Sequence, residues 1–100
     1  MDLSTKQVNV AVQVLPVSKN RNSYSIVDKA IEVIQQSGVK YVVTPFETVM
    51  EGEYNQLMDI VKRVQEVCYS NDAENLMCYV KIQSSAEREI TIDDKIGKYK

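Results

Sequence analysis

The sequence predicts an α+β domain in which two helices cover one face of a four-stranded antiparallel sheet. Segments with alternating apolar residues, typical of strands, are separated by segments in which apolar residues recur every three or four positions, typical of helices. Their order is β-α-β-β-α-β, which makes two β-α-β units joined by a tight connection. Since each crossover should be right-handed, we expect a split β-α-β sandwich, the ferredoxin-like arrangement.

The first part of the chain contains a strand and a helix. Alternating valines predict a strand over residues 8–15, and Pro16 is expected to end it. After a polar loop, Ser23 or Ser25 can cap a helix, and Gly38 is placed to stop it. The predicted inward stripe of this helix consists of Val27, Ala30, Ile31 and Ile34.

The rest of the chain supplies the other elements. Residues 39–44 are β-branched and aromatic and predict a second strand, and residues 48–50 predict a short return strand. Residues 51–53 are expected to turn into a second helix with acidic residues in its first turn. The expected inward positions of that helix are Tyr54, Leu57, Val61, Val64 and Cys68. Those of the last strand are Leu76, Cys78, Val80 and Ile82. Residues 90–95 predict a short C-terminal helix capped by Thr91.

Composition and charge exclude several classes of function. Residues 1–100 make one domain, with 44% hydrophobic residues and a net charge of −2 that predicts neither a nucleic-acid nor a membrane partner. No apolar run approaches the roughly 20 residues that span a bilayer, and the first ten residues do not resemble a leader, so we expect a cytoplasmic protein. Histidine is absent and the two cysteines lack metal spacing. We therefore expect no metal, no cofactor and no catalysis.

The second face of the predicted sheet is mixed rather than fully polar. Its expected residues are Asn9, Ala11, Gln13, Leu15, Met77, Tyr79 and Lys81. Apolar side chains among the polar ones suggest partial cover by another subunit. We expect a homo-oligomer, a dimer or tetramer, that forms through this open face, with Tyr79 turned toward the subunit contact.

The densest cluster of unusual residues is the segment 44–53. On one interpretation it is structural: its proline shapes a turn, and its carboxylates complement the start of the second helix. On the other, Glu47 and Glu51, held near Phe46 and Thr48, face a cationic or amine-bearing ligand. Alternation points Thr48 and Glu51 to opposite faces, so one ligand could reach both only if the strand bends or two subunits contribute.

Three stretches of the chain resemble a known family. The runs VNVAVQVLP, SIVDKAIEVIQQSG and YVVTPFETVMEGEYNQLMDIVK are similar to the small thiamine-binding proteins, the single-domain relatives of the two-repeat YkoF proteins. The most specific part is the pattern P-x-x-T-x-x-E-G, present as Pro45, Thr48, Glu51 and Gly52. The resemblance implies a ferredoxin-like protomer whose open sheet faces pair, commonly in tetramers, and which binds thiamine or its hydroxymethylpyrimidine portion.

The sequence also departs from the family pattern. Many relatives carry glycine where Glu47 stands and arginine where Asn75 stands, and an aspartate and an arginine where Gln83 and Ser85 stand. These changes could retune or abolish the family's ligand site without harming the fold.

The sequence therefore predicts a non-enzymatic binding protein for thiamine or a related aminopyrimidine. The alternative is a regulatory or structural homo-oligomer whose open face binds itself or a protein partner without a small ligand; an unrecognised enzyme is third. The candidate ligand-binding residues are Gln13, Thr44, Phe46, Glu47, Thr48, Glu51 and Tyr79.

Overall fold

The computed structural model describes residues 1–96 and contains four strands and three helices in that part of the chain. In chain order they are β1 (Gln7–Val17), α1 (Ser23–Gln36), β2 (Lys40–Val43), β3 (Thr48–Glu53), α2 (Tyr54–Ser70), β4 (Asn75–Gln83) and α3 (Ile92–Ile96).

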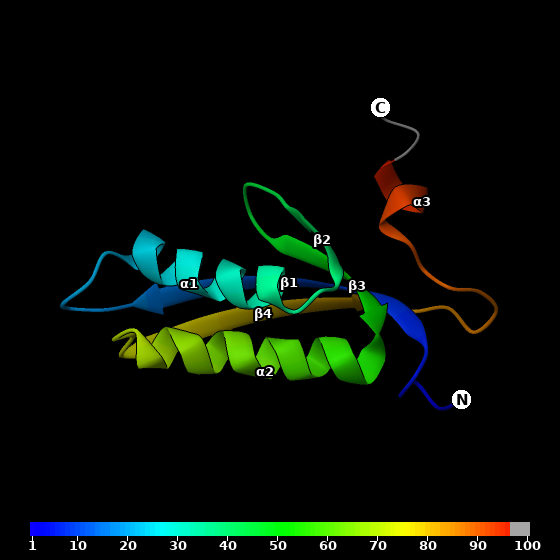
Figure 1. The fold of residues 1–100 in the computed structure, drawn as a ribbon, viewed down its shortest axis with the longest axis horizontal. Coiled ribbons are helices and arrows are strands. Elements are labelled where there is room, and N and C mark those ends of the chain that lie inside the picture. The colour runs from blue at the N-terminus through cyan, green and yellow to red at the C-terminus, as the bar shows by residue number, and fades with distance from the viewer. Residues whose placement is uncertain (97–100) are drawn as a thin grey trace.

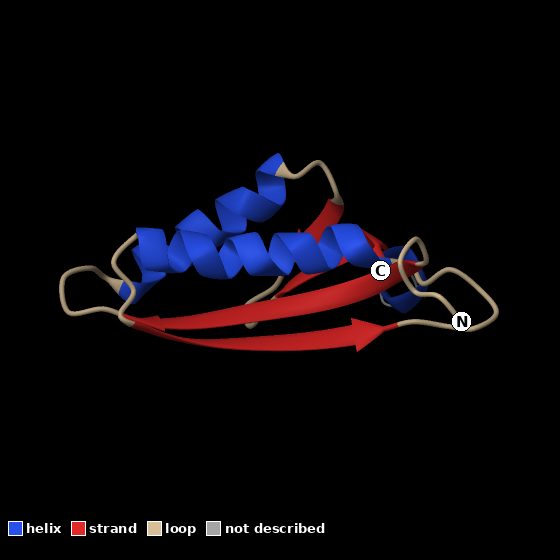
Figure 2. Cartoon of the chain, turned by 90° about the horizontal axis from the view of Figure 1, so that it is seen from below, coloured by secondary structure: helices blue, strands red, loops and turns tan. Residues whose placement is uncertain are grey.

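The strands form one antiparallel sheet in the order β2-β3-β1-β4 (Figure 1). Both long helices lie on the same face of this sheet (Figure 2). This is the ferredoxin-like arrangement that the sequence predicts. Within residues 1–96, no helix has both the length and the apolar character needed to cross a bilayer.

The core lies between the two helices and the inward face of β1. The alternating valines of β1 are buried there as predicted: Val8, Val10, Val12 and Val14. In α1 the fully buried residues are instead Ile26, Ala30 and Ile34. Val27 and Ile31, expected to face inward, are only half-buried, because they border a hollow beyond the ends of β2 and β3 rather than the sheet itself.

Two boundaries in the first part of the chain differ from the sequence prediction. Pro16 does not end β1; it pairs with Leu76 of β4. Since β3 pairs with β1 only as far as Val12, β1 has a neighbour on one side only at Pro16, and a strand tolerates proline there. The cap of α1 is Asn22, whose Oδ1 accepts a hydrogen bond from the Tyr24 amide at 2.8 Å, rather than either predicted serine.

Gly38 follows α1 with a φ of +85°, the left-handed conformation that favours glycine after a helix, as predicted. The return strand β3, by contrast, is longer than expected. Glu51 and Glu53 stay in the strand and pair with β1, so the first turn of α2 contains no acidic residue. A Cβ at Gly52 would lie 3.2 Å from Cδ2 of Leu57, so glycine lets the first turn of α2 fold closely onto the strand.

The inward stripe of α2 is as predicted for its buried positions, with Ile60 in addition, while Tyr54 is half-buried. The last strand is less covered than expected. Val80 and Ile82 are 36% and 44% exposed, because β4 is an edge strand with a neighbouring strand on one flank only.

Both cysteines carry free thiols. Cys68 of α2 is buried and Cys78 of β4 is half-buried. Burial raises the pKa of each thiol, since a thiolate is poorly solvated there. A raised pKa lowers the fraction of reactive thiolate, so neither residue has the features of a catalytic cysteine.

The segment after β4 folds back onto the open face of the sheet. Ile90 and Ile92 are buried, and the amide of Ile92 donates a 2.8 Å hydrogen bond to Oε1 of Glu51. Thr91 caps α3 as predicted, its Oγ1 accepting from the Asp94 amide at 3.1 Å. α3 lies at the end of the molecule near the N-terminus (Figure 1) and covers only that end of the open face.

Candidate functional site

The β2–β3 turn is held by its own hydrogen bonds. The amide and the hydroxyl of Thr44 both donate to the carbonyl of Glu47, at 2.9 and 2.6 Å, and the Thr44 hydroxyl accepts from the Glu47 amide at 3.1 Å. Pro45 further restricts the backbone. This rigid turn leaves the ring of Phe46 79% exposed, beside the sheet.

Glu47 reaches across the open face to Lys81. Its Oε1 lies 2.8 Å from Nζ of Lys81 on β4, although Glu47 directly precedes β3 and β1 lies between β3 and β4. Strands two places apart are roughly 10 Å from each other, so both side chains must extend over β1. Ala11 is the β1 residue paired with Lys81, and its small side chain leaves room for the pair.

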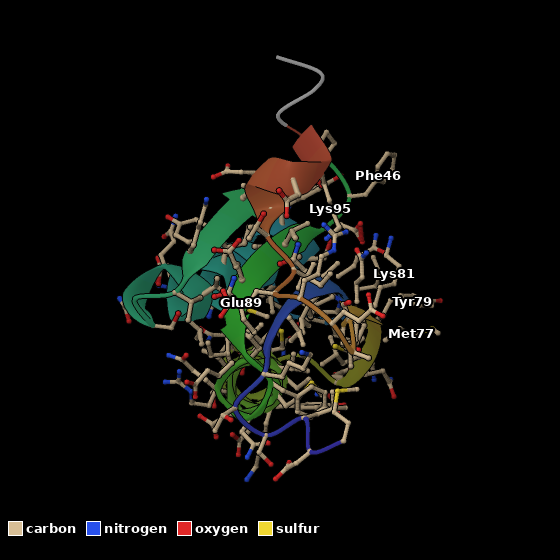
Figure 3. All side chains as sticks on the ribbon, turned by 90° about the vertical axis from the view of Figure 1, so that its right-hand side faces the viewer. Phe46, Met77, Tyr79, Lys81, Glu89 and Lys95 are labelled. Carbon is tan, nitrogen blue, oxygen red and sulfur yellow. The ribbon has the colours of Figure 1, made fainter. Side chains whose placement is uncertain are left out.

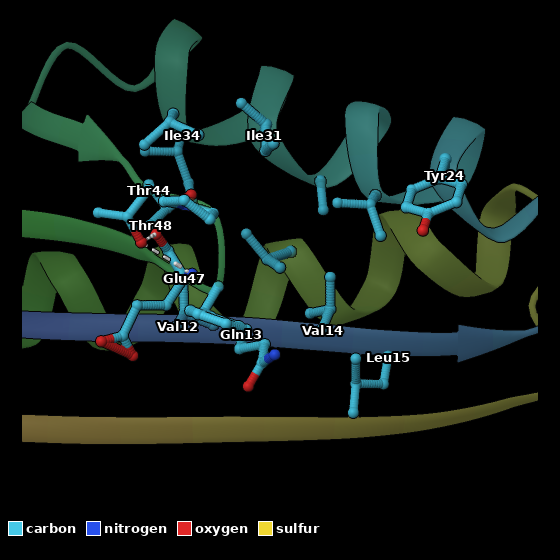
Figure 4. Close-up of a pocket in the computed structure, with 16 residues that line it drawn as sticks. Val12, Gln13, Val14, Leu15, Tyr24, Ile31, Ile34, Thr44, Glu47 and Thr48 are labelled. Carbon is cyan, nitrogen blue, oxygen red and sulfur yellow. Dashed lines mark hydrogen bonds between the residues drawn. The ribbon is translucent and has the colours of Figure 1, made fainter.

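Two hollows meet at this turn. The first, of about 270 Å³, lies between α1 and the part of β1 that extends beyond its pairing with β3 (Figure 4). The second, of about 470 Å³, lies on the open face. Both are lined by Gln13, Phe46 and Glu47, and the open-face hollow adds Tyr79 and Lys81. Figure 3 shows Tyr79, Lys81 and Phe46 projecting from the same side of the molecule.

Thr48 lies in the wall of the helix-side hollow. It is only 5% exposed, and its hydroxyl makes no hydrogen bond with the residues that the structure describes. Most of the surrounding wall is aliphatic, contributed by α1 and β1. No buried side-chain oxygen of the described residues lacks a partner, so the unpaired hydroxyl of Thr48 is open to the hollow. There it can donate to or accept from a ligand, which makes Thr48 a candidate ligand contact.

The structure brings together six of the seven predicted site residues. Gln13, Thr44, Phe46, Glu47 and Thr48 line the helix-side hollow, and Tyr79 joins three of them on the open face. Glu51 lies apart, under the C-terminal segment, and lines neither hollow. As alternation predicts, Thr48 and Glu51 point to opposite faces of β3.

The two carboxylates expected to face a cationic or amine-bearing ligand both have partners within the protein. Glu47 is paired with Lys81, and Glu51 accepts the Ile92 amide, so neither carboxylate is left as an isolated negative charge. The partner role of Lys81 was not predicted from the sequence. Alternation places it on the open face, but its meeting with Glu47 depends on the register of β4 against β1, which alternation alone does not give.

The profile of the thiamine-binding protein family matches residues 10–100. This chain belongs to that family. The match covers the turn, both hollows and the C-terminal segment. The family is one of binding proteins, and no enzymatic family is indicated.

One similar protein sequence and two similar solved structures agree with this assignment. A UPF0045 protein of Clostridium perfringens is 42% identical, over 92% of this chain and 96% of its own length. A DUF77 domain of unknown function from Bacillus cereus is 43% identical with a TM-score of 0.93, over 100% of this chain and 96% of that one. A candidate thiamine biosynthesis or salvage protein from Thermotoga maritima is 33% identical with a TM-score of 0.85, over 94% and 99%.

At the level of the fold alone, a designed protein with a ferredoxin fold superposes with a TM-score of 0.55 at 12% identity, over 87% of this chain and 93% of the designed one.

Proposed function

We propose that this protein binds thiamine or a related aminopyrimidine such as hydroxymethylpyrimidine, without catalysing a reaction. The observation that carries the proposal is the hollow between α1 and β1, where the hydroxyl of Thr48 lies unpaired in an apolar wall beside Gln13 and Glu47. Membership of the thiamine-binding family supports it, as does the relation to a candidate thiamine biosynthesis or salvage protein.

The chemistry of the hollow suits an aminopyrimidine ring. Such a ring has an amine that donates and ring nitrogens that accept, while a hydroxyl and a side-chain amide can each do both and a carboxylate accepts. Phe46 and Tyr79 offer aromatic faces near the mouth. A volume of about 270 Å³ is near the lower end of ordinary ligand pockets, which begin at about 300 Å³, and suits a single ring.

Calorimetric titration tests the proposal. Hydroxymethylpyrimidine and thiamine are titrated into the wild type and into Thr48→Ala and Glu47→Gln. We expect each substitution to weaken binding roughly tenfold, since each removes a hydrogen-bonding group or its charge. Glu51→Gln, which changes a carboxylate outside both hollows, should bind like the wild type.

Absence of wild-type binding at millimolar ligand would reject the ligand. If Thr48→Ala and Glu47→Gln both bind like the wild type, the proposed ligand stands but the proposed site is wrong. Loss of binding in Glu51→Gln alone would place the binding site at the other end of the open face, beside Glu51.

We further propose that the protein is a homo-oligomer formed through the open face, where Leu15, Met77 and Tyr79 are 45%, 57% and 50% exposed. Full burial of an exposed leucine or methionine side chain gains about 1.5–3 kcal/mol, and covering the half that is still exposed here gains roughly half of that. Light scattering should show more than a monomer, and Tyr79→Lys should dissociate it. Tyr69→Lys is the matched control, since Tyr69 on α2 is 53% exposed and faces away from the sheet. A wild-type monomer at micromolar concentration would contradict this interface.

The same apolar residues support the alternative function, an oligomer without a small ligand. An assembly that Tyr79→Lys dissociates, together with no binding of either compound, would favour that alternative.

A further inference from the structure

We propose that the open face beside Glu47 receives an anionic group, so that the ligand of this protein is a phosphate ester of the aminopyrimidine compound rather than the unphosphorylated form. This inference rests on the proposed function and names the ligand class within it.

The charges on this part of the open face carry the inference. A third hollow, of about 240 Å³, lies next to the first two and is lined by Lys81 and Lys95. Figure 3 shows both lysines on the same side of the molecule. Glu47 is the one carboxylate among the residues that line it. The side-chain amides of Asn9 and Gln83 are further polar groups in its wall.

The other acids near this hollow each have a partner of their own, although Glu51 and Asp94 still act electrostatically on Lys95. Glu51 accepts the amide of Ile92, Asp93 is paired with Lys40 at 2.7 Å, and Asp94 with Arg88 at 4.0 Å. With the amide of Asn9 oriented so that its oxygen faces Lys95, that oxygen lies 2.6 Å from Nζ. An ammonium has three donors, so neither Lys95 nor Lys81 is saturated by the one partner described for it. Among its lining residues the hollow thus presents two cations against one carboxylate.

This balance favours an anion over a cation. A cationic ring placed here would have to compete with Lys81 for Glu47, whereas a phosphate can accept from both ammonium groups while the Glu47–Lys81 pair stays intact. Slight desolvation also lowers the pKa of the exposed Lys95 side chain from its ordinary value, and a bound anion would oppose that shift.

The three hollows share lining residues. Glu47 lines all of them, and Lys81 lines both on the open face. A ligand whose ring occupies the helix-side hollow can therefore extend past the turn toward the lysines. One elongated molecule would then contact Thr48 at one end and Lys81 at the other.

The test compares phosphorylated and unphosphorylated forms of the same compounds. Hydroxymethylpyrimidine, its monophosphate, thiamine and thiamine monophosphate are titrated into the full chain at low salt. We expect each monophosphate to bind at least tenfold more tightly than its unphosphorylated form, and the difference to shrink at high salt. Lys81→Met and Lys95→Met should remove most of that difference, while Lys62→Met, an exposed lysine of α2, should keep it.

Lys81→Met should also increase the affinity for unphosphorylated thiamine, because Glu47 then lacks its cationic partner. This opposite response separates a local charge effect from misfolding. Equal binding of the phosphorylated and unphosphorylated forms by the wild type would overturn the inference and leave the proposed function intact. If none of the four compounds binds, the proposed function fails and the inference fails with it.

Discussion

Replacing Ile26 by alanine is expected to lower the free energy of unfolding by about 2–5 kcal/mol, because the side chain is fully buried in the core and its removal leaves a cavity. Ile26 lies on the side of α1 that faces the core between the helices and the sheet. Urea denaturation of the ligand-free protein, followed by far-UV circular dichroism, measures the change. The slope of the transition should stay constant if only stability has altered.

Ile31→Ala is the matched control, with the same change on the same helix. Ile31 is half-buried and borders the helix-side hollow, so its truncation enlarges an existing hollow and should cost clearly less than the Ile26 change. Equal losses, or a larger loss for Ile31, would mean that α1 is rotated about its axis relative to the arrangement described above. The volume of the helix-side hollow would then be smaller than about 270 Å³.

Replacing Glu51 by alanine is expected to release the C-terminal segment from the sheet. The Glu51 carboxylate accepts the amide of Ile92 at 2.8 Å, and hydrogen bonds to charged groups contribute about 1.5–3 kcal/mol. Loss of this bond should raise the exchange rate of the Ile92 amide roughly tenfold or more. Hydrogen–deuterium exchange followed by NMR measures it at a single residue, and amides in the middle of β1 should change little.

Glu53→Ala is the control for this experiment. Glu53 lies two positions away on the same strand, is exposed, and makes no side-chain hydrogen bond at the start of α2. Its removal changes the net charge equally but should leave the Ile92 amide protected. If both variants released the segment equally, a general charge effect rather than the Glu51 contact would be responsible.

Much of the fold could be predicted because it follows from local patterns. Alternating valines fix the buried face of β1, and spacings of three and four identify the buried side of α2. Boundaries were less predictable because they depend on neighbours. Pro16 is accommodated where β1 lacks one partner strand, and Glu51 stays in β3 because that strand continues to pair with β1.

In the candidate site, too, some features follow from the local sequence and others depend on distant parts of the chain. The rigid turn with Phe46 and Glu47 follows from the residues around Pro45, and the opposite directions of Thr48 and Glu51 follow from alternation. On the ligand-binding interpretation, however, the carboxylates of this segment were expected to face a cationic or amine-bearing ligand. Lys81 and the Ile92 amide come from distant parts of the chain, and each engages one of these carboxylates.

The sequence by itself determined the order of the elements, the inward face of each long strand and the position of the turn, since these depend on residues close together in the chain. Only the tertiary structure decided what the turn faces. The pairing of Glu47 with Lys81 requires the register of β4 on β1 and the small side chain of Ala11 between them. The hollow beside Thr48 exists because β3 leaves β1 at Val12 while α1 continues above it. Both features depend on how separate elements meet, and side-chain interactions across a sheet carry no signal in the spacing of either strand.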